Sequence, residues 1–81
     1  MAKHELKSPI PGTFYRRSAP DQPVFREVGD VVSKGDVVGL IEVMKSFHEI
    51  TSDVNGTISA FAVEDTDPVM AGQTLVEMDV Q

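Results

Sequence analysis

The stretch Val37-Val38-Gly39-Leu40-Ile41-Glu42-Val43 is mostly β-branched and apolar, and it predicts a strand. A second strand is predicted at Phe47–Thr51. Because so few residues separate the two runs, we expect a tight hairpin with its turn at Met44-Lys45. Position alone favours a plain hairpin with one exposed lysine. The usual turn residues, glycine and asparagine, are absent there, however, which suggests that the two side chains have another task.

Strand patterns recur outward from this hairpin, while no window shows a clean helical period. Further strands are predicted at His4–Ser8, Thr13–Arg16, Val24–Val28, Thr57–Val63 and Thr74–Met78. Seven or so short strands separated by Gly, Pro and Asp predict an all-β fold, a small sandwich or barrel.

The sequence also repeats itself weakly. Ser8–Phe14 resembles Ser52–Ile58, and Val32–Val38 resembles Val69–Leu75. The first half carries 7 extra residues, and the Pro-rich, polar stretch Arg16–Pro23 accounts for them as an inserted loop. We therefore expect two pseudo-equivalent halves that meet near residues 44–51.

Four glycines and one lysine fall at matched turns or bends of this repeat. Gly35 and Gly72 are expected to adopt positive φ, and Gly12 and Gly56 to suit close contacts between strands. Lys34 is interpreted as part of a turn and not as a second functional lysine.

Composition excludes several classes of protein. The 81 residues make one domain at most, and the absence of cysteine excludes disulfides and Cys-ligated metals. Two histidines, His4 and His48, are too few for a histidine metal site, so no metal is expected. A net charge of −6 argues against nucleic-acid binding, and no apolar run is long enough for a membrane span. No signal-peptide pattern is present, so we expect a cytoplasmic location.

The charge is unevenly distributed along the chain. All seven Lys and Arg residues lie within residues 1–45, whereas residues 46–81 hold seven acidic residues and no Lys or Arg. A solvated acidic surface is the simpler interpretation. The alternative is an acidic face that steers docking onto basic partner enzymes.

Read together, several motifs resemble one family. Glu42-Val43-Met44-Lys45 is similar to the biotin attachment motif of biotin carboxyl carrier proteins. Ser8–Arg16 resembles the opening segment of that family. Ser18–Asp21, followed by Phe25–Gly29, resembles the carriers of bacterial acetyl-CoA carboxylases, which have an inserted loop called the thumb at this point. The resemblance extends over residues 8–78.

The resemblance implies a flattened eight-stranded β-barrel, a barrel-sandwich hybrid of two four-stranded sheets related by a quasi-twofold axis. Residues 1–81 would form a single biotinyl carrier domain, with a thumb at about 17–23 and an attachment hairpin at about 43–47. The termini would lie at the end opposite the lysine. The short segment before the first strand fits either a free-standing carrier or an excised domain, and Met1 slightly favours a free-standing carrier.

For function, the resemblance implies that biotin is attached through an amide to Lys45, with Glu42, Val43, Met44 and Ser46 around it. The biotin would carry carboxyl groups from biotin carboxylase to carboxyltransferase, in an acetyl-CoA carboxylase of fatty acid biosynthesis. A biotin protein ligase would be the third partner, and the chain itself would be a non-catalytic subunit. The family usually has Met where this chain has Ser46, which bears on how efficiently the ligase modifies the site.

Two alternatives stay open. Lipoyl carriers share the fold, but their lysine typically follows Asp, whereas Met44 precedes Lys45 here. A barrel that has lost its modification and serves as an interaction module is the other alternative, and Ser46 is its only support. For the thumb, the family suggests a flap that limits the motion of biotin, with Arg16, Arg17 and Asp21 as candidate hydrogen-bonding residues.

Overall fold

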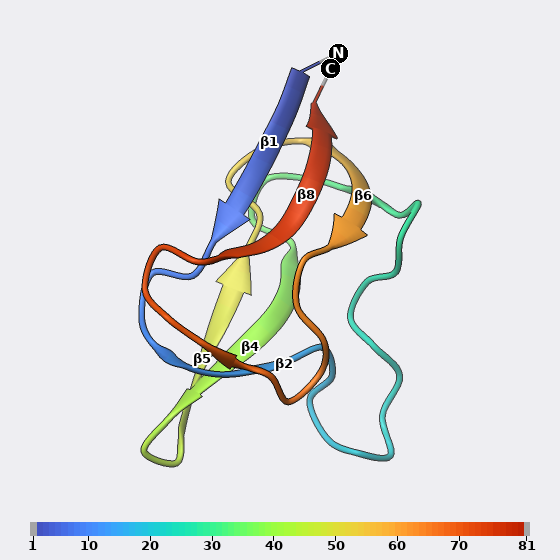
Figure 1. Ribbon diagram of the computed structural model, residues 1–81. Helices are drawn as coiled ribbons and strands as arrows, with labels where there is room; N and C mark the ends of the chain where they lie inside the picture. The colour runs from blue at the N-terminus through green and yellow to red at the C-terminus, as the bar shows by residue number, and fades with distance from the viewer. Residues whose placement is uncertain (1, 81) are drawn as a thin grey trace.

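The computed structural model describes residues 2–80, and that part of the chain consists of strands, turns and loops without a helix (Figure 1). The strands are β1 (Ala2–Lys7), β2 (Gly12–Tyr15), β3 (Val31–Val32), β4 (Val37–Val43), β5 (Ser46–Thr51), β6 (Gly56–Phe61), β7 (Pro68–Val69) and β8 (Thr74–Val80). Within residues 2–80 there is accordingly no helix of the length and apolar character needed to cross a membrane.

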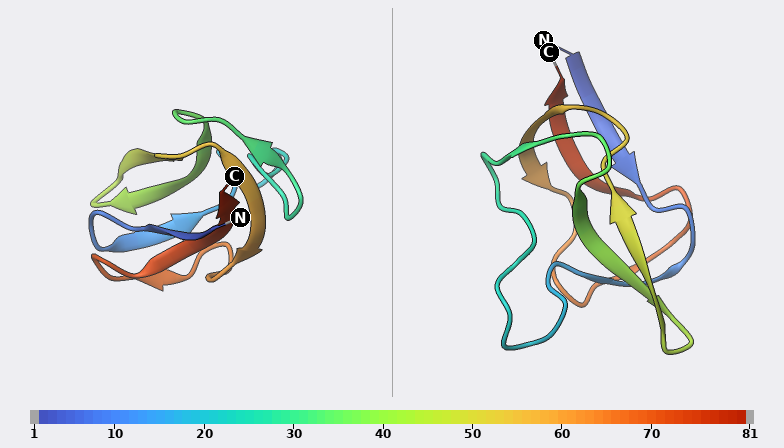
Figure 2. Two further views of the ribbon diagram at one scale, coloured as in Figure 1. Left: turned by 90° about the horizontal axis from the view of Figure 1, so that it is seen from above. Right: turned by 180° about the vertical axis from the view of Figure 1, so that it is seen from behind.

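The strands form two four-stranded sheets. Their orders are β1-β8-β6-β3 and β5-β4-β2-β7, and every pairing is antiparallel. Seen from above, the strands surround a common interior (Figure 2, left). The expected all-β flattened barrel of two four-stranded sheets is confirmed.

The two sheets are built from equivalent parts, as the repeat predicts. The strands correspond one to one along the two sheets. β1 corresponds to β5, β8 to β4, β6 to β2 and β3 to β7. The turns match as well. Gly35 N–H donates to the Ser52 carbonyl at 2.8 Å, and Gly72 N–H donates to the Ser8 carbonyl at 2.7 Å. A quasi-twofold relation therefore holds for hydrogen bonds as well as for strand order.

Both halves contribute to one core. Twelve apolar side chains are buried: Leu6, Phe14, Val32, Val38, Ile41, Ile50, Ile58, Val63, Val69, Leu75, Val76 and Met78. Two serines are buried with them, and each hydroxyl donates to a carbonyl two residues on, Ser8 to Ile10 and Ser52 to Val54. Burying these hydroxyls is tolerated because they are hydrogen-bonded.

Two glycine positions in the first half are demanded for different reasons. A Cβ on Gly12 would overlap the Glu42 carbonyl oxygen and lie 2.7 Å from Ile41 Cγ2, so only glycine lets β2 lie this close to β4. Gly35 has a φ of 97° and open space where a Cβ would be. Glycine is favoured here only because of the backbone conformation. The expected positive φ of Gly35 is confirmed.

The inserted loop differs from the sequence prediction at its far end. The strand expected at Val24–Val28 is wrong, because that segment forms bends and turns beside the barrel, and Val28 is exposed. Phe25 N–H donates to the Arg16 carbonyl at 2.8 Å, and the Glu27 N–H is accepted by the Asp30 carboxylate, which closes a turn instead of extending a ladder.

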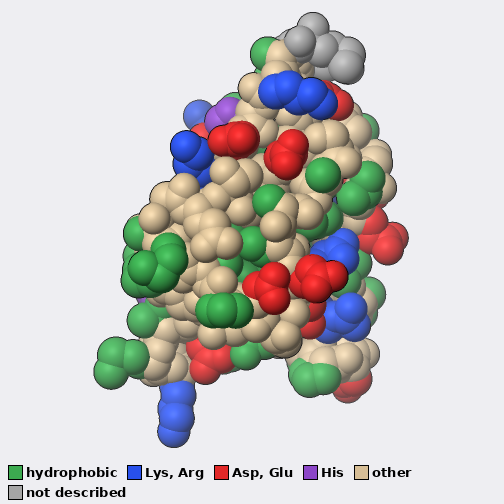
Figure 3. Space-filling view, in the orientation of Figure 1, with side chains coloured by type: hydrophobic (Ala, Val, Ile, Leu, Met, Phe, Trp, Pro, Cys, Tyr) green, Lys and Arg blue, Asp and Glu red, His purple; other side chains and the backbone are tan. Residues whose placement is uncertain are grey.

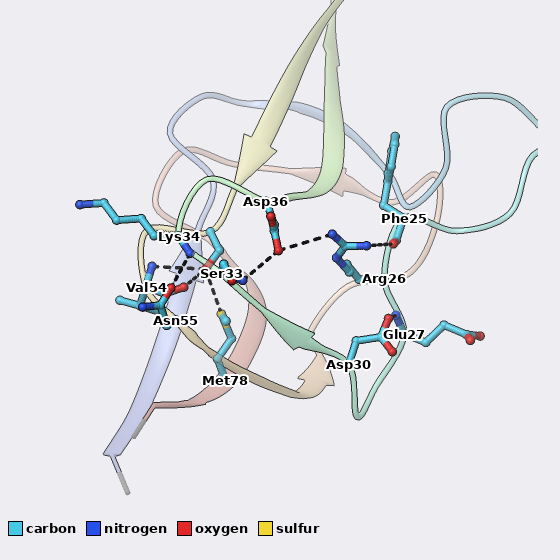
Figure 4. A network of polar contacts seen from close by, with 11 residues as sticks. Phe25, Arg26, Glu27, Asp30, Ser33, Lys34, Asp36, Val54, Asn55 and Met78 are labelled. Carbon is cyan, nitrogen blue, oxygen red and sulfur yellow. Dashed lines mark hydrogen bonds and ion pairs between the residues drawn. The ribbon is translucent and has the colours of Figure 1, made fainter.

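The end of this loop is fixed to the barrel. The Arg26 guanidinium lies 3.5 Å from the Asp36 carboxylate, which also accepts the Ser33 N–H at 2.8 Å (Figure 4). Beside these contacts, the Lys34 N–H donates to the Asn55 side-chain carbonyl at 2.7 Å. Lys34 therefore occupies a turn, as expected. Several other strand boundaries shift by one or two residues, for example β6, which ends at Phe61 instead of Val63. The two-residue strands β3 and β7 were not predicted.

The close approach at Gly12 gives a stability test. Gly12→Ala should lower the free energy of unfolding by about 3 kcal/mol, because a Cβ forces β2 away from β4. Gly35→Ala should lower it by only about 1 kcal/mol, since it adds strain without a clash. Urea denaturation of both variants measures the difference, and equal losses would contradict the close-packing explanation.

Candidate functional site at the β4–β5 hairpin

The register of β4 against β5 leaves a two-residue turn at the end of the hairpin. Val43 pairs with Ser46, and Met44 and Lys45 between them have φ values of 49° and 68°. A two-residue hairpin turn with both residues at positive φ is the type I′ turn, whose preferred sequence is Asn-Gly. For Met and Lys this conformation costs roughly 1 kcal/mol or more each. The chain thus places long side chains where folding alone favours short ones.

The turn projects its side chains into solvent. Lys45 is exposed, Met44 is 92% exposed, and Ser46 is exposed on the first residue of β5. A basic side chain stands clear of the body at the hairpin end of the molecule (Figure 3), and the two chain termini lie at the opposite end (Figure 1). Glu42 and Val43 are half-buried, and Val43 packs against the core. The five residues singled out in the sequence therefore lie at or next to one turn, and three of them, Met44, Lys45 and Ser46, are exposed.

The Glu42 side chain is held by a residue that sequence reasoning did not select. The Tyr15 hydroxyl donates to Glu42 Oε1 at 3.0 Å, and this hydrogen bond to a carboxylate raises the pKa of Tyr15 above its ordinary value. The Tyr15 ring also lies 6.1 Å from the Phe47 ring, tilted by 55°. Tyr15 thereby joins side chains of β4 and β5 to β2, next to the root of the inserted loop.

A groove separates the hairpin from the inserted loop. It has a volume of about 330 Å³ and is lined by Tyr15, Arg17, Ser18, Ala19, Pro20, Phe47, Asp65 and Thr66. Of the three candidate hydrogen-bonding residues of the thumb, only Arg17 lines it. Arg16 instead stacks on Phe61 at 4.1 Å from the ring centroid, and Asp21 is exposed. A larger and more open hollow of about 670 Å³ lies beside β6 and includes no hairpin residue.

Thr66 is the strained residue of this groove. Its φ is 73°, and its N–H donates to the Phe14 carbonyl at 2.7 Å. The equivalent position in the first half is Gly29, with a φ of 97° and an N–H that donates to the Ile58 carbonyl at 2.8 Å. Gly29 and Thr66 thus share a positive φ at equivalent positions. This conformation is easy for glycine and unfavourable for the β-branched threonine. An alignment of the two repeats would have shown that Thr66 stands where the other half has Gly29.

The described residues hold no cluster of three or more His, Cys, Asp or Glu side chains that suits a metal ion. Within residues 2–80 no ion pair or hydrogen bond occupies the Lys45 amine either. A small barrel that presents a free lysine on a strained turn has the geometry of a domain that carries a group on a side chain.

Comparison with known proteins identifies the family. The family model described as "Biotin-requiring enzyme", for biotin and lipoyl domains, matches residues 4–78. The chain therefore belongs to this family.

Its relatives include the biotin carboxyl carrier protein of chloroplastic acetyl-CoA carboxylase from Glycine max, 53% identical over 64 residues that cover 79% of this chain and 24% of the relative. The corresponding protein from Nostoc sp. is 43% identical over 74 residues, 91% of this chain and 41% of the relative. The crystal structure of Kluyveromyces lactis urea carboxylase matches with a TM-score of 0.78 and 26% identity, covering 98% of this chain and 6% of that one. The chain thus spans less than half the length of these relatives.

The strained turn predicts a stability gain when its residues are replaced. The double variant Met44→Asn, Lys45→Gly should raise the free energy of unfolding by about 1–2 kcal/mol, because Asn-Gly suits a type I′ turn. Urea denaturation measures the free energy of unfolding of the variant and the wild type. A lower value for the variant would show that the turn is not strained.

Thr66 allows a similar test with a matched control. Thr66→Gly should raise the free energy of unfolding by about 1 kcal/mol, because relief of strain exceeds the added backbone entropy. Gly29→Thr, at the equivalent turn, should lower it by a similar amount. Thermal denaturation of both variants tests the pair, and a Thr66→Gly variant less stable than the wild type would contradict the assignment of strain.

Proposed function

We propose that Lys45 is the attachment point for biotin and that the chain is a carboxyl carrier. The observation that carries the proposal is the exposed lysine on a strained two-residue turn, at the end of the barrel away from the termini. Family membership and the names of the relatives support the choice of biotin. In this proposal the chain receives carboxyl groups from biotin carboxylase and delivers them to carboxyltransferase, within an acetyl-CoA carboxylase.

The residues at the turn suit such an attachment. A primary amine on a four-carbon stem forms an amide with a carboxylic acid, and the amide removes the positive charge of the lysine. When bound, biotin supplies the nitrogen that accepts and releases the carboxyl group. Glu42, Val43, Met44 and Ser46 form the surroundings that a biotin protein ligase meets around the amine.

What the chain itself contributes is presentation. The turn is held rigidly by the pairing of Val43 with Ser46 and by the core packing of Val43. An attached group therefore starts from a fixed point and moves on a flexible stem. Tethering makes each visit to a partner intramolecular, with effective concentrations on the order of millimolar.

The groove beside the hairpin offers a resting place for the attached group. Phe47 and Tyr15 supply apolar ring surface there, and Arg17 and Thr66 supply donors. Contact with this groove would limit the motion of the group between visits, which is the role that the family resemblance implies for the thumb. Asp21 and Arg16 do not line the groove.

The chain is proposed to be non-catalytic, since the relatives are named as the biotin carboxyl carrier protein of acetyl-CoA carboxylase. The lipoyl alternative is disfavoured by the same names and by Met44 before the lysine. The cytoplasmic location stays a prediction, and the relative from Glycine max is named as chloroplastic.

The attachment site is tested by intact-mass spectrometry after incubation with biotin protein ligase, ATP and biotin. The wild type should gain the mass of one biotin less one water, and peptide mapping should place it on Lys45. Lys45→Arg should gain nothing, because arginine cannot form the amide, and should keep the wild-type melting temperature. Lys34→Arg, at another exposed turn, is the control and should be labelled normally. Labelling of Lys45→Arg would refute the site.

A further inference from the structure

The inserted loop is hydrogen-bonded to the barrel only near its root. Inside the loop, the Gln22 N–H donates to the Ala19 carbonyl at 3.0 Å, and Arg17 Nη1 donates to the Gln22 carbonyl at 3.3 Å. In the part of the chain that the structure describes, residues 17–24 make no hydrogen bond to the barrel. The loop projects at the end of the molecule where the β4–β5 hairpin lies (Figure 1). The hydrogen bonds that fix its direction therefore lie where it begins and ends.

Arg16 is the residue at which the loop closes. Its carbonyl accepts the Phe25 N–H at 2.8 Å, and its Nη2 donates to the Arg26 carbonyl at 3.2 Å. These two contacts join the residue before the loop to the residues after it. Arg16 thus holds both ends of the loop together.

The Arg16 side chain also ties the loop to β6, in the other sheet. Its guanidinium carbon lies 4.1 Å from the centroid of the Phe61 ring, at the end of β6. The Nε atom of Arg16 is buried. A guanidinium that stacks on a ring is held more firmly when it is removed from water. The side chain therefore anchors the beginning of the loop against the barrel wall.

A third contact fixes the Arg16 backbone. The Asp65 carboxylate, in the turn Glu64–Asp67, accepts the Arg16 N–H at 2.7 Å. The turn itself does not need this carboxylate, because the equivalent turn Glu27–Asp30 has Val28 at that position. Each of the two turns closes with the same hydrogen bond of 2.9 Å, from the N–H of its first residue to the carboxylate of its fourth. Asp65 thus serves the root of the loop and not its own turn.

The root determines the shape of the groove beside the hairpin. The loop residues Arg17–Pro20 line one side of this groove, and Phe47 of the hairpin lines it as well. Arg16 lies outside the lining. Since the loop has its hydrogen bonds to the barrel near its root, release of Arg16 lets this side of the groove move away from Phe47.

We propose that Arg16 is a positioning residue that holds the loop Arg17–Val24 in place and so keeps the groove in shape for the biotin on Lys45. The inference rests on the proposed function, in which the attached biotin rests in this groove. Arg16 acts through the loop and not by touching the biotin. Lysine is no substitute for it, because an ammonium group has no flat face to stack on Phe61 and is more strongly hydrated.

The loop is tested first on the unmodified chain, by ¹⁵N relaxation. Arg16→Met keeps a long unbranched side chain but removes the guanidinium. Asp65→Val removes the acceptor and installs the residue of the equivalent turn. In both variants the order parameters of residues 18–22 should fall from about 0.85 to below about 0.6. Asp65→Asn keeps an oxygen that accepts the Arg16 N–H, so its order parameters should stay near the wild-type values.

The groove is tested next on the biotinylated chain. Nuclear Overhauser contacts between biotin and the Phe47 ring should be present in the wild type and should weaken at least twofold in Arg16→Met. Lys3→Met, which removes a cation paired with Asp79 on the other sheet, is the control and should leave both measurements unchanged. Order parameters at the turn of residues 70–73 show whether the barrel itself has loosened, and they should not change.

Wild-type loop order in both Arg16→Met and Asp65→Val would overturn the proposal. An equal fall at residues 70–73 would also overturn it, since the whole barrel would then have loosened. A loosened loop with unchanged biotin contacts would separate Arg16 from the groove and overturn its role there. If Arg16→Met does not fold, the comparison of Asp65→Val with Asp65→Asn decides the result. Failure of the proposed function is a separate result, in which the wild-type chain is not labelled on Lys45.

Discussion

The pairing of Val43 with Ser46 is the constraint on which the rest depends. It leaves two residues to reverse the chain, and the type I′ turn that they form, which suits the right-handed twist of the strands, has positive φ at both. Met44 and Lys45 accept this conformation because β4 is held on its other side by β2, where Gly12 allows close contact with the Glu42 backbone. The barrel thus holds the turn, and the turn sets the backbone position from which the Lys45 side chain extends.

The same frame is built twice, and its two ends differ in structure. At one end lie the termini, and at the other lies the β4–β5 hairpin. Residues that serve the frame recur in both halves, as do the buried hydroxyls of Ser8 and Ser52. Two differences between the halves lie beside the hairpin, where Thr66 stands in place of a glycine and Phe47 in place of a lysine. Departures from internal symmetry are therefore found at the end of the molecule where we propose the attachment site.

Much of the fold could be predicted from the sequence, because period and turn residues are local signals. The strand at 37–43 was predicted with its observed bounds, and the repeat predicted the matched turns at Gly35 and Gly72. Strands of two residues, such as β3, give no period to detect. Val24–Val28 has strand-forming residues but lies on a loop without a partner strand, and tertiary context overrides its propensity.

The site was predictable only where a motif marked it. Lys45 and its neighbours were found by resemblance, while Tyr15 and Thr66 act through contacts between residues far apart in sequence. The positive φ of Thr66 could not be predicted from the amino-acid composition around it. The effect of Ser46 on the ligase stays a prediction.

Carboxyl transfer through the chain is the most direct test of the carrier account. The biotinylated chain is incubated with biotin carboxylase, ATP and labelled bicarbonate, isolated, and then given to carboxyltransferase with acetyl-CoA. The account predicts that label is recovered on the chain at Lys45 and passes from it to the acyl-CoA product. Label that never joins the chain, or that stays on it when the acceptor is added, would contradict the account.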